Sequence, residues 1–536
     1  MIKVANYCKS AALAGALLLI NTACDDKFTE LSPYTRLSET LVFDSPANIE
    51  LTANGVYSQA AIGTYNGSTG RGYPFGAASI IQSEMRGEDF VNLEQFFAIT
   101  YEATYNTTSA NNTNHWDQLY NLINQANLFI EGVRRAEEQG IITKEVADAY
   151  EGEGRFLRAL SHHELLIHWS LPYAEGANAN AYGVPYRDFG INSTESVERA
   201  ASVDRGTVKG TYDKILADLD YAESVLPETS SDPANKISRA KKGAAIALKT
   251  RIKLHLGDWQ GVINEGTKMG TNGTGEFSSP VGGYRLTPSP VTPFTNFQNN
   301  SESIFSIANG PNSNPGTNGS LPRMLGPAGP GGRGLVSANP NFYNSTELWV
   351  EGDIRREQLF VHDPIGTYKH YFQKKYTDYN NQGDWAPIIR YAEVLLNVAE
   401  AYARIGNDAQ ALALLNAVRN RSVPVEDQYT SAPADLVKAI LNERRVELFA
   451  EGRRWPDIHR LVLDEKYTTG GIPAKVKSSA WGGALKNDGS DYGYGKPAIP
   501  TEQAAIPYTD YRFLWPINNE EVTRNPLLLQ QQNPGY

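Results

Sequence analysis

The sequence predicts a mainly α-helical protein in which a tetratricopeptide-type repeat of helix pairs is interrupted by large loop-rich insertions with a few short strands. Two observations support this fold class. Apolar residues recur every three or four positions through 205–262 and again through 388–463, as they do on the buried face of a helix. Between these regions, residues 269–346 lose the periodicity and are rich in Gly, Pro, Asn and Ser, which is typical of long functional or disordered loops.

The first 23 residues are typical of a lipoprotein signal peptide. Two lysines precede an apolar run at 11–20, which is too short to span a bilayer, because a spanning helix needs about 20 residues. Cys24 follows Thr-Ala directly, as the acylated cysteine of a bacterial lipoprotein does, although Asn21 replaces the aliphatic residue usual in that motif. We therefore expect Cys24 to be acylated, with palmitate as a candidate acyl group, so that lipid anchors the mature chain to a membrane.

The composition restricts the possible ligands and the redox chemistry of the chain. The 536 residues carry a formal net charge of -11, which argues against nucleic acid as a partner, because phosphates require a basic surface. Cys8 and Cys24 are the only cysteines, so we expect no disulfide in the mature protein. The chain is longer than the roughly 250–300 residues that one hydrophobic core supports, which favours two lobes or a large insertion.

The N-terminal half alternates predicted helices with loops that carry aromatic residues. Ser45 and Pro46 form a cap followed by a proline in the first turn, a pattern that starts a helix. The loop at 63–76 contains many glycines and two tyrosines, and the stretch at 96–114 is polar, with scattered aromatic residues. Helices are predicted from the apolar periodicity at 45–60, 114–140, 143–169, 205–226 and 238–256.

The most regular stretch, 388–463, contains two helical pairs. Gly406 can end the first helix of a pair in the left-handed conformation, and Asn407 can cap the second. Gly257 and Asp258 repeat this turn earlier in the chain. Because the same pair of a glycine and a capping residue recurs between helices, the sequence indicates a repeat of the tetratricopeptide type.

Four glutamates in this stretch, two on the first helical pair and two on the second, allow two interpretations. Glu443 and Glu447 share a helix face, and Glu393 and Glu400 repeat at an interval of seven. Because the planar guanidinium group is the best partner for a buried carboxylate, we expect an ion-pair network. The alternative is the catalytic carboxylate pair of a glycoside hydrolase; neighbouring arginines argue against it, because they keep the carboxylates ionised and occupied. The arginines expected to take part are Arg444, Arg445, Arg453, Arg454 and Arg460.

Three long segments resemble the SusD/RagB family. They are RYAEVLLNVAEAYARIG at 390–406, NERRVELFAEGRRWPDIHRL at 442–461 and FLWPINNEEVTRNPLLLQQQNPGY at 513–536. The resemblance implies a SusD-like helical scaffold and an outer-membrane lipoprotein that binds an oligosaccharide and hands it to a SusC-like TonB-dependent transporter. It implies neither catalysis nor a cofactor. An acidic pair after Cys24, Asp25 and Asp26, resembles the signal with which such lipoproteins reach the cell exterior.

The chain is expected to divide into a signal peptide and three further regions. Short strands are predicted at 303–308 and 369–375 within the long insertion. The predicted regions are 1–23, the signal peptide; 24–268, a helical region with aromatic loops; 269–387, a loop-rich insertion; and 388–536, a helical repeat region that contains a second loop insertion at 468–509.

Candidate binding residues are aromatic side chains on these loops. An aromatic ring stacks on the apolar face of a pyranose, while neighbouring polar side chains bind its hydroxyls, provided that a scaffold holds the loops rigidly. The family motifs lie in the scaffold, so they identify no binding residue, and each ring alone is more often a packing residue. The candidates are Tyr65, Tyr73, Phe75, Phe96, Tyr284, Phe342, Tyr343, Trp481, Tyr492 and Tyr494.

Other patterns in the sequence do not support a metal site or a different chemistry. His163 and His168 are five residues apart, whereas a zincin needs two histidines one turn apart with a glutamate between them. The run starting at Asn487 resembles a calcium-binding loop but lacks the glutamate that closes such a loop at its twelfth position. Two alternatives to oligosaccharide capture stay open: capture of peptides, as in a RagB-like lipoprotein, and a helical-repeat interaction module without a small ligand.

Overall fold

The computed structural model describes residues 41–65 and 68–536. This part of the chain is mainly helical with short strands, which confirms the predicted fold class. The predicted signal peptide at 1–23 and the predicted acylation site Cys24 lie outside the described residues.

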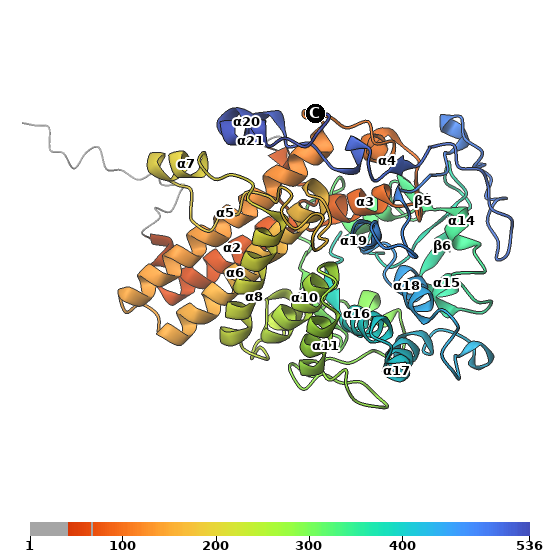
Figure 1. Cartoon of the computed structure of the whole chain (residues 1–536), viewed down its shortest axis with the longest axis horizontal. Helices are drawn as coiled ribbons and strands as arrows, with labels where there is room; N and C mark the ends of the chain where they lie inside the picture. Colours follow the sequence, from red (N-terminus) through yellow and green to blue (C-terminus); the bar gives the residue numbers. More distant parts are fainter. Residues whose placement is uncertain (1–40, 66–67) are drawn as a thin grey trace, which may run out of the picture.

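The long helices pack side by side in chain order (Figure 1). Helix α5 packs against α6, α6 against α8, α8 against α10, α10 against α11, and α11 against α16, which also contacts α17 and α18. The bounds of the scaffold helices are α2 (Pro46–Ala61), α5 (Ala110–Glu138), α6 (Lys144–Trp169), α8 (Val208–Val225), α10 (Lys242–His255), α11 (Trp259–Lys268), α16 (Tyr391–Arg404), α17 (Asp408–Arg419), α18 (Leu436–Glu447) and α19 (Arg454–Leu461).

The turns inside the helix pairs have the predicted chemistry. Gly257 and Gly406 both adopt positive φ angles, 66° and 80°, a region that side chains with a Cβ rarely enter. The side chain of Asp258 then accepts a hydrogen bond from a backbone amide three residues on, at 2.9 Å, and Asn407 does the same at 3.3 Å. These two identical turns confirm that α10–α11 and α16–α17 are equivalent helical pairs.

The strands are short and form separate antiparallel pairs. The predicted strand at 303–308 is observed as β4, and the one at 369–375 contains β7. The pairs are β1 (Thr64–Tyr65) with β2 (Ser68–Thr69), β3 (Phe90–Asn92) with β5 (Val336–Ala338), β4 (Ser303–Ile307) with β8 (Ala386–Arg390), β6 (Phe360–His362) with β7 (Tyr371–Gln373), and β9 (Gly471–Ile472) with β10 (Ile506–Pro507).

Short helices fill the connections. They are η3 (Leu41–Phe43), α3 (Ala77–Arg86), η4 (Gln95–Phe97), α4 (Ala98–Tyr101), α7 (Thr194–Ala200), α9 (Asn235–Ser238), α12 (Thr292–Thr295), α13 (Leu321–Leu325), α14 (Pro340–Tyr343), α15 (Ile354–Gln358), η5 (Val425–Asp427), η6 (Ser479–Trp481), η7 (Tyr511–Phe513), α20 (Asn519–Arg524) and α21 (Pro526–Gln530).

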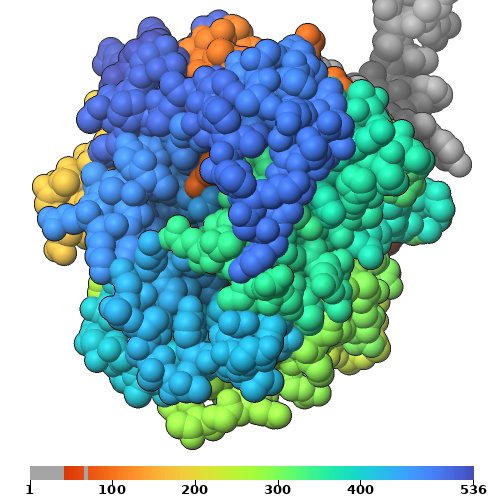
Figure 2. All heavy atoms as spheres, turned by 90° about the vertical axis from the view of Figure 1, so that its right-hand side faces the viewer, coloured from red at the N-terminus to blue at the C-terminus, as the bar shows by residue number. Residues whose placement is uncertain are grey.

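The loop-rich insertion 269–387 and the second loop insertion 468–509 pack against each other at the end of the molecule opposite α5. In the space-filling view the blue C-terminal loop lies across the green insertion, and the surface is hollowed beside it (Figure 2). Hydrogen bonds hold them together: the Asn344 side chain donates to the Asp491 carbonyl, and the Lys369 amide donates to the Asn487 carbonyl, both at 2.8 Å. The insertion is therefore irregular in sequence but ordered by packing.

The predicted glutamates form a buried ion-pair network. Both carboxylate oxygens of Glu443 and of Glu447 accept hydrogen bonds from arginine. Glu447 lies within 3.0 Å of Arg355, Arg390 and Arg421. Burial alone would raise the pKa of Glu447, but the guanidinium groups outweigh it and lower the pKa. With every oxygen occupied, neither residue is available as a catalytic acid or base.

The arginines of this network differ from those the sequence predicts. Glu400 does pair with Arg460, at 2.8 Å, whereas Glu393 pairs with Arg251 of α10, at 2.6 Å. Adjacent helix residues do not share a face, so Arg444 and Arg445, which follow Glu443 directly, point to other partners. The predicted arginines other than Arg460 bind as follows: Arg444 binds Asp457, Arg445 and Arg454 bind Glu88, and Arg453 donates to the Glu451 carbonyl.

Candidate functional site

One predicted aromatic side chain lies exposed over a surface hollow. The hollow has a volume of about 340 Å³ and lies between η4–α4 and the loop 477–481. Trp481 forms one wall and is 41% exposed, and Ile99, 36% exposed, forms another. The exposed amide group of Gln95 lies on the same lining, whereas Asn92 is 7% exposed and its amide nitrogen donates to the Glu94 carbonyl. The hollow therefore combines a large apolar ring with side chains that both donate and accept hydrogen bonds.

The Trp481 ring is fixed by its backbone and by its own indole nitrogen. Nε1 donates to the Leu93 carbonyl at 2.8 Å. Ser478 caps η6 by accepting from the Ala480 amide, and Gly482 ends it with a φ of 76°. The ring thus presents one position to solvent, and little side-chain entropy remains to be lost when a ligand binds.

Two tyrosines from different parts of the chain, Tyr101 and Tyr368, hold the segments around the hollow in place. Tyr368 donates to the carbonyl of Leu93 and lies 3.0 Å from a carboxylate oxygen of Glu94. Tyr101 donates to the Val476 carbonyl at 2.6 Å, and burial raises its pKa well above the ordinary value. Both hydroxyls are therefore structural: Tyr101 joins α4 to the loop that carries Trp481, and Tyr368 joins the long insertion to residues 93–94.

A pair of opposite charges closes the rim. Lys477 Nζ lies 3.0 Å from Glu102 Oε1, and both side chains are partly exposed. Each group retains hydrogen-bonding capacity that the other does not use. The hollow is thus polar without carrying a net charge from this pair.

Phe96 lies beside this hollow in η4, directly after Gln95. Its half-buried ring is flanked by two guanidinium groups: the Cζ atoms of Arg71 and Arg333 each lie 5.1 Å from the ring centroid. Arg333 also donates to the Asn318 side chain at 2.7 Å. Phe96 and Trp481 are thus the two predicted residues that the structure brings to this surface.

The other predicted aromatic residues lie elsewhere. Tyr494 is half-buried, and the guanidinium group of Arg356 stacks on its ring. Tyr65 belongs to β1, and its side chain lies outside the description. The buried rings, exposed by at most 7%, are Tyr73, Phe75, Tyr284, Phe342, Tyr343 and Tyr492.

The burial of these rings follows from the packing of the loops on the scaffold. Tyr492, for example, donates to the Ala338 carbonyl at 2.7 Å, and its ring packs edge-on against Tyr343, with 5.9 Å between the centroids. A ring packed in this way has no face to offer a ligand, so we do not include the buried rings in the proposed site. Sequence reasoning missed Ile99 and Lys477, although both fall in or beside loops that it singled out.

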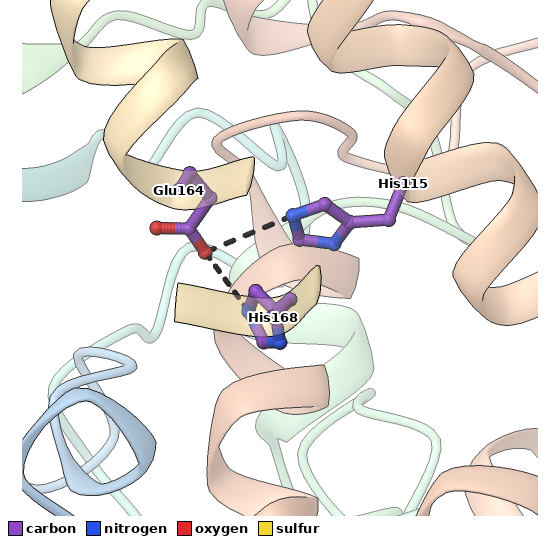
Figure 3. Close-up of side chains that lie close together, drawn as sticks. All are labelled: His115, Glu164 and His168. Carbon is purple, nitrogen blue, oxygen red and sulfur yellow. Dashed lines mark hydrogen bonds and ion pairs between the residues drawn. The ribbon is translucent and has the colours of Figure 1, made fainter. Parts of the chain in front are cut away.

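A second cluster of polar side chains is buried inside the helical scaffold (Figure 3). Oε1 of Glu164 lies 3.7 Å from Nε2 of His115 and 3.3 Å from Nε2 of His168. All three side chains are buried, and burial lowers the pKa of His115 to about 3. Neutral imidazoles and a carboxylate are the donors that zinc prefers, so the cluster has to be tested as a metal site.

The hydrogen bonds of His168 argue against a metal in this cluster. Its Nδ1 lies 3.0 Å from Nη1 of Arg86, and a guanidinium group can only donate. Nδ1 is therefore the acceptor, and Nε2 carries the proton that it donates to Glu164. A metal ion would need the lone pair of that same nitrogen and would also lie close to the positive charge of Arg86. We interpret the cluster as a structural hydrogen-bonded group.

Two further histidines of α6, His162 and His163, pack against different partners. His162 stacks on Tyr186 with 3.8 Å between the ring centroids, whereas His163 packs edge-on against His255. Both are buried, and burial lowers the pKa of each to about 3.

Among the described helices, none is both long and apolar enough to cross a bilayer.

Comparisons with known proteins cover almost the whole chain. The sequence model of the SusD family matches residues 360–536, and a model described as starch-binding and associating with the outer membrane matches residues 27–254. SusD-like protein P2 of Formosa agariphila is 25% identical over 572 aligned positions, which cover 97% of this chain and 98% of the relative.

Solved structures share the fold. A SusD superfamily protein from Bacteroides fragilis superposes with a TM-score of 0.71 at 26% identity, over 90% of this chain and 99% of that one. Surface glycan-binding protein A from Bacteroides uniformis superposes with a TM-score of 0.67 at 20% identity, over 91% and 99%. The second likeness concerns the fold alone.

Proposed function

We propose that this chain, which belongs to the SusD-like family, captures oligosaccharides at the Trp481 hollow and delivers them to a SusC-like TonB-dependent transporter. Members of this family are binding proteins rather than enzymes, and the family is associated with the outer membrane. The occupied carboxylates of Glu443 and Glu447 agree with a role without catalysis.

The observation that carries this proposal is the exposed ring of Trp481 beside the exposed amide side chain of Gln95. Trp481 is the most exposed tryptophan or phenylalanine among the described residues, at 41%. A pyranose has an apolar C–H face that stacks on such a ring, and its hydroxyls are both donors and acceptors, as is the exposed amide of Gln95. The family model that matches residues 27–254 is described as starch-binding, which supports the same class of ligand.

Binding is tested by affinity electrophoresis and calorimetry with a panel of soluble polysaccharides and their oligosaccharides. We expect at least one to bind and Trp481→Ala to weaken its Kd tenfold or more, about 1.4 kcal/mol. Trp259→Ala is the matched control, because this half-buried tryptophan lies on α11 outside the hollow, and should leave Kd unchanged. Binding of peptides but of no polysaccharide would favour the RagB-like alternative instead.

Membrane anchoring and delivery are separate parts of the proposal. If Cys24 is the acylation site, Cys24→Ala should move the protein from the outer-membrane fraction to the soluble fraction and abolish incorporation of labelled palmitate. Delivery predicts that the lipoprotein co-purifies with a TonB-dependent barrel. If a variant that binds no glycan captures the barrel as well as wild type does and supports the same uptake, the ligand-independent interaction module is favoured.

A further inference from the structure

A second groove lies at the far end of the β9–β10 ladder from the Trp481 hollow. Its volume is about 490 Å³, and three tyrosines line it: Tyr182, Tyr508 and Tyr511. Tyr182 is 48% exposed and Tyr511 is 47% exposed. Its lining includes Asn533 and Pro534 near the C-terminus, and the C-terminus lies at the same edge of the molecule as α4 (Figure 1). Nothing in the sequence patterns pointed to these rings as ligands.

The three rings are held in place before any ligand arrives. The hydroxyl of Tyr508 accepts a hydrogen bond from Asn178 at 2.8 Å. Tyr511 packs edge-on against Tyr536, with 5.0 Å between the ring centroids. The guanidinium carbon of Arg205 lies 5.5 Å from the centroid of Tyr182, which leaves the ring substantially exposed. Rings fixed in this way offer stacking surfaces at a low entropic cost.

The charge of the groove limits the class of ligand. Asp510 is the only carboxylate that lines it in the described part of the chain, and Arg512 donates two hydrogen bonds to it, at 2.9 and 2.7 Å. These hydrogen bonds lower the pKa of Asp510, so the acid stays ionised and paired. The described lining residues therefore leave no uncompensated charge to attract a phosphate, a sulfate or an amine. Asn180 and Thr509 instead offer exposed neutral donors and acceptors.

The two binding surfaces share one structural element. Lys477 lines the Trp481 hollow, and Tyr508 lines the second groove. The amide of Tyr508 donates to the Gly470 carbonyl, so Tyr508 sits opposite the start of the segment that reaches Lys477. Residues 470–477 span about 20 Å when extended, a distance that corresponds to several sugar residues. A glycan that contacts both surfaces must therefore be a polymer of at least this length, and a short oligosaccharide can occupy only one of them.

We propose that the groove between Tyr182, Tyr508 and Tyr511 is a second carbohydrate subsite, which takes a neutral, hydroxyl-rich stretch of the glycan chain held at Trp481. This inference rests on the proposed function and adds a ligand class and a length requirement to it. Two linked weak sites raise the affinity for a polymer well above that of either site alone, because the second contact forms within the same complex.

The test compares wild type with Trp481→Ala, the double variant Tyr182→Ala/Tyr511→Ala, and Leu51→Ala, which removes a 67% exposed apolar side chain outside both grooves. Affinity electrophoresis uses starch, xylan, laminarin, galactomannan, polygalacturonate and chondroitin sulfate. Short oligosaccharides of the polymer that retards wild type most are then titrated by calorimetry. Thermal unfolding checks that each variant is folded.

We expect a neutral polymer to retard wild type most, and the double variant to bind it at least tenfold more weakly. Wild type should bind two short oligosaccharides per chain, and the double variant and Trp481→Ala one each. Tyr182→Phe/Tyr511→Phe keeps the ring faces and should retain the affinity for the polymer. Leu51→Ala should behave as wild type.

The outcomes separate this inference from the proposed function. If Trp481→Ala weakens binding while the double variant does not, and wild type binds one short oligosaccharide, the second subsite is refuted and the proposed function stands. If the double variant alone weakens binding, the groove stands and the Trp481 site is refuted. Preference for polygalacturonate or chondroitin sulfate overturns the neutral ligand class. If no polysaccharide retards wild type, both proposals fall.

Discussion

The charged region around α16 and α18 and the loop-rich surface around Trp481 differ in the way they use polar groups. In the first, Glu443 and Glu447 are 2% exposed, and every carboxylate oxygen accepts from an arginine. In the second, the exposed amide of Gln95 and a single, partly exposed ion pair lie beside an exposed ring. In this protein a high density of paired charges is therefore characteristic of the scaffold. Polar side chains that do not use all of their hydrogen-bonding capacity are characteristic of the candidate ligand surface.

The largest effect is expected from removing one charge of the buried network. Glu447→Gln leaves Arg355, Arg390 and Arg421 without their shared counter-charge, and breaking a buried pair by removing one partner costs about 3–5 kcal/mol. Urea unfolding followed by circular dichroism measures the loss. Glu520→Gln, which breaks an exposed pair with Arg524, is the matched control and should stay within about 0.5 kcal/mol. Equal stabilities of the two variants would mean that the network does not hold the scaffold together.

Sequence periodicity was sufficient to predict the scaffold, because its causes are local. Buried faces repeat every 3.6 residues, and the turns at Gly257 and Gly406 need only a glycine followed by a capping side chain. The partners in the ion-pair network have no such local cause. Arg355 lies 88 positions before Glu443, so no spacing rule connects them, and the arginines next to the glutamates in sequence were the wrong choice.

The candidate site was predicted less well than the scaffold, also for a physical reason. Trp481 and Tyr492 lie in the same irregular loop, and both are aromatic residues among glycines and polar residues. One is 41% exposed and the other 6%. The difference arises because the segment after Asn487 folds back onto Asn344 and Ser337, which are far away in the sequence. Composition identifies the loop, and only tertiary packing decides which ring faces solvent.

A smaller effect is expected where the N-terminal region meets α18 and α19. Burial alone would raise the pKa of Glu88, but Arg445 and Arg454 outweigh it and lower the pKa from 4.5 to about 2. A lowered pKa means that the folded state binds the proton less readily than the unfolded state, so this contribution to stability is complete above pH 4.5 and is lost as the pH falls toward 2.

Glu88→Gln tests this junction directly. We expect the variant to lose about 2 kcal/mol of stability at pH 7, as is typical for hydrogen bonds to charged groups, and to show a smaller decline between pH 4.5 and 2 than wild type. Urea midpoints measured at intervals across this range provide the comparison. An unchanged pH dependence would show that Glu88 is not the group whose protonation weakens the folded state.

The smallest effect is expected from the ion pair on the ligand surface, and it makes the contrast between the two regions quantitative. Lys477 and Glu102 are 3.0 Å apart, as close as the partners in the buried network, but both are partly exposed. Exposed pairs are worth about 0–1 kcal/mol, so Lys477→Ala should hardly change the free energy of unfolding. Its effect on the Kd of a bound oligosaccharide should be about two- to fivefold, because a donor at the rim is lost. A double-mutant cycle with Glu102→Gln separates the two roles: a coupling energy that is small for unfolding and larger for binding fits a surface kept available for a ligand. Coupling of several kcal/mol in the unfolding experiment would instead make this pair part of the scaffold and erase the distinction between the two regions.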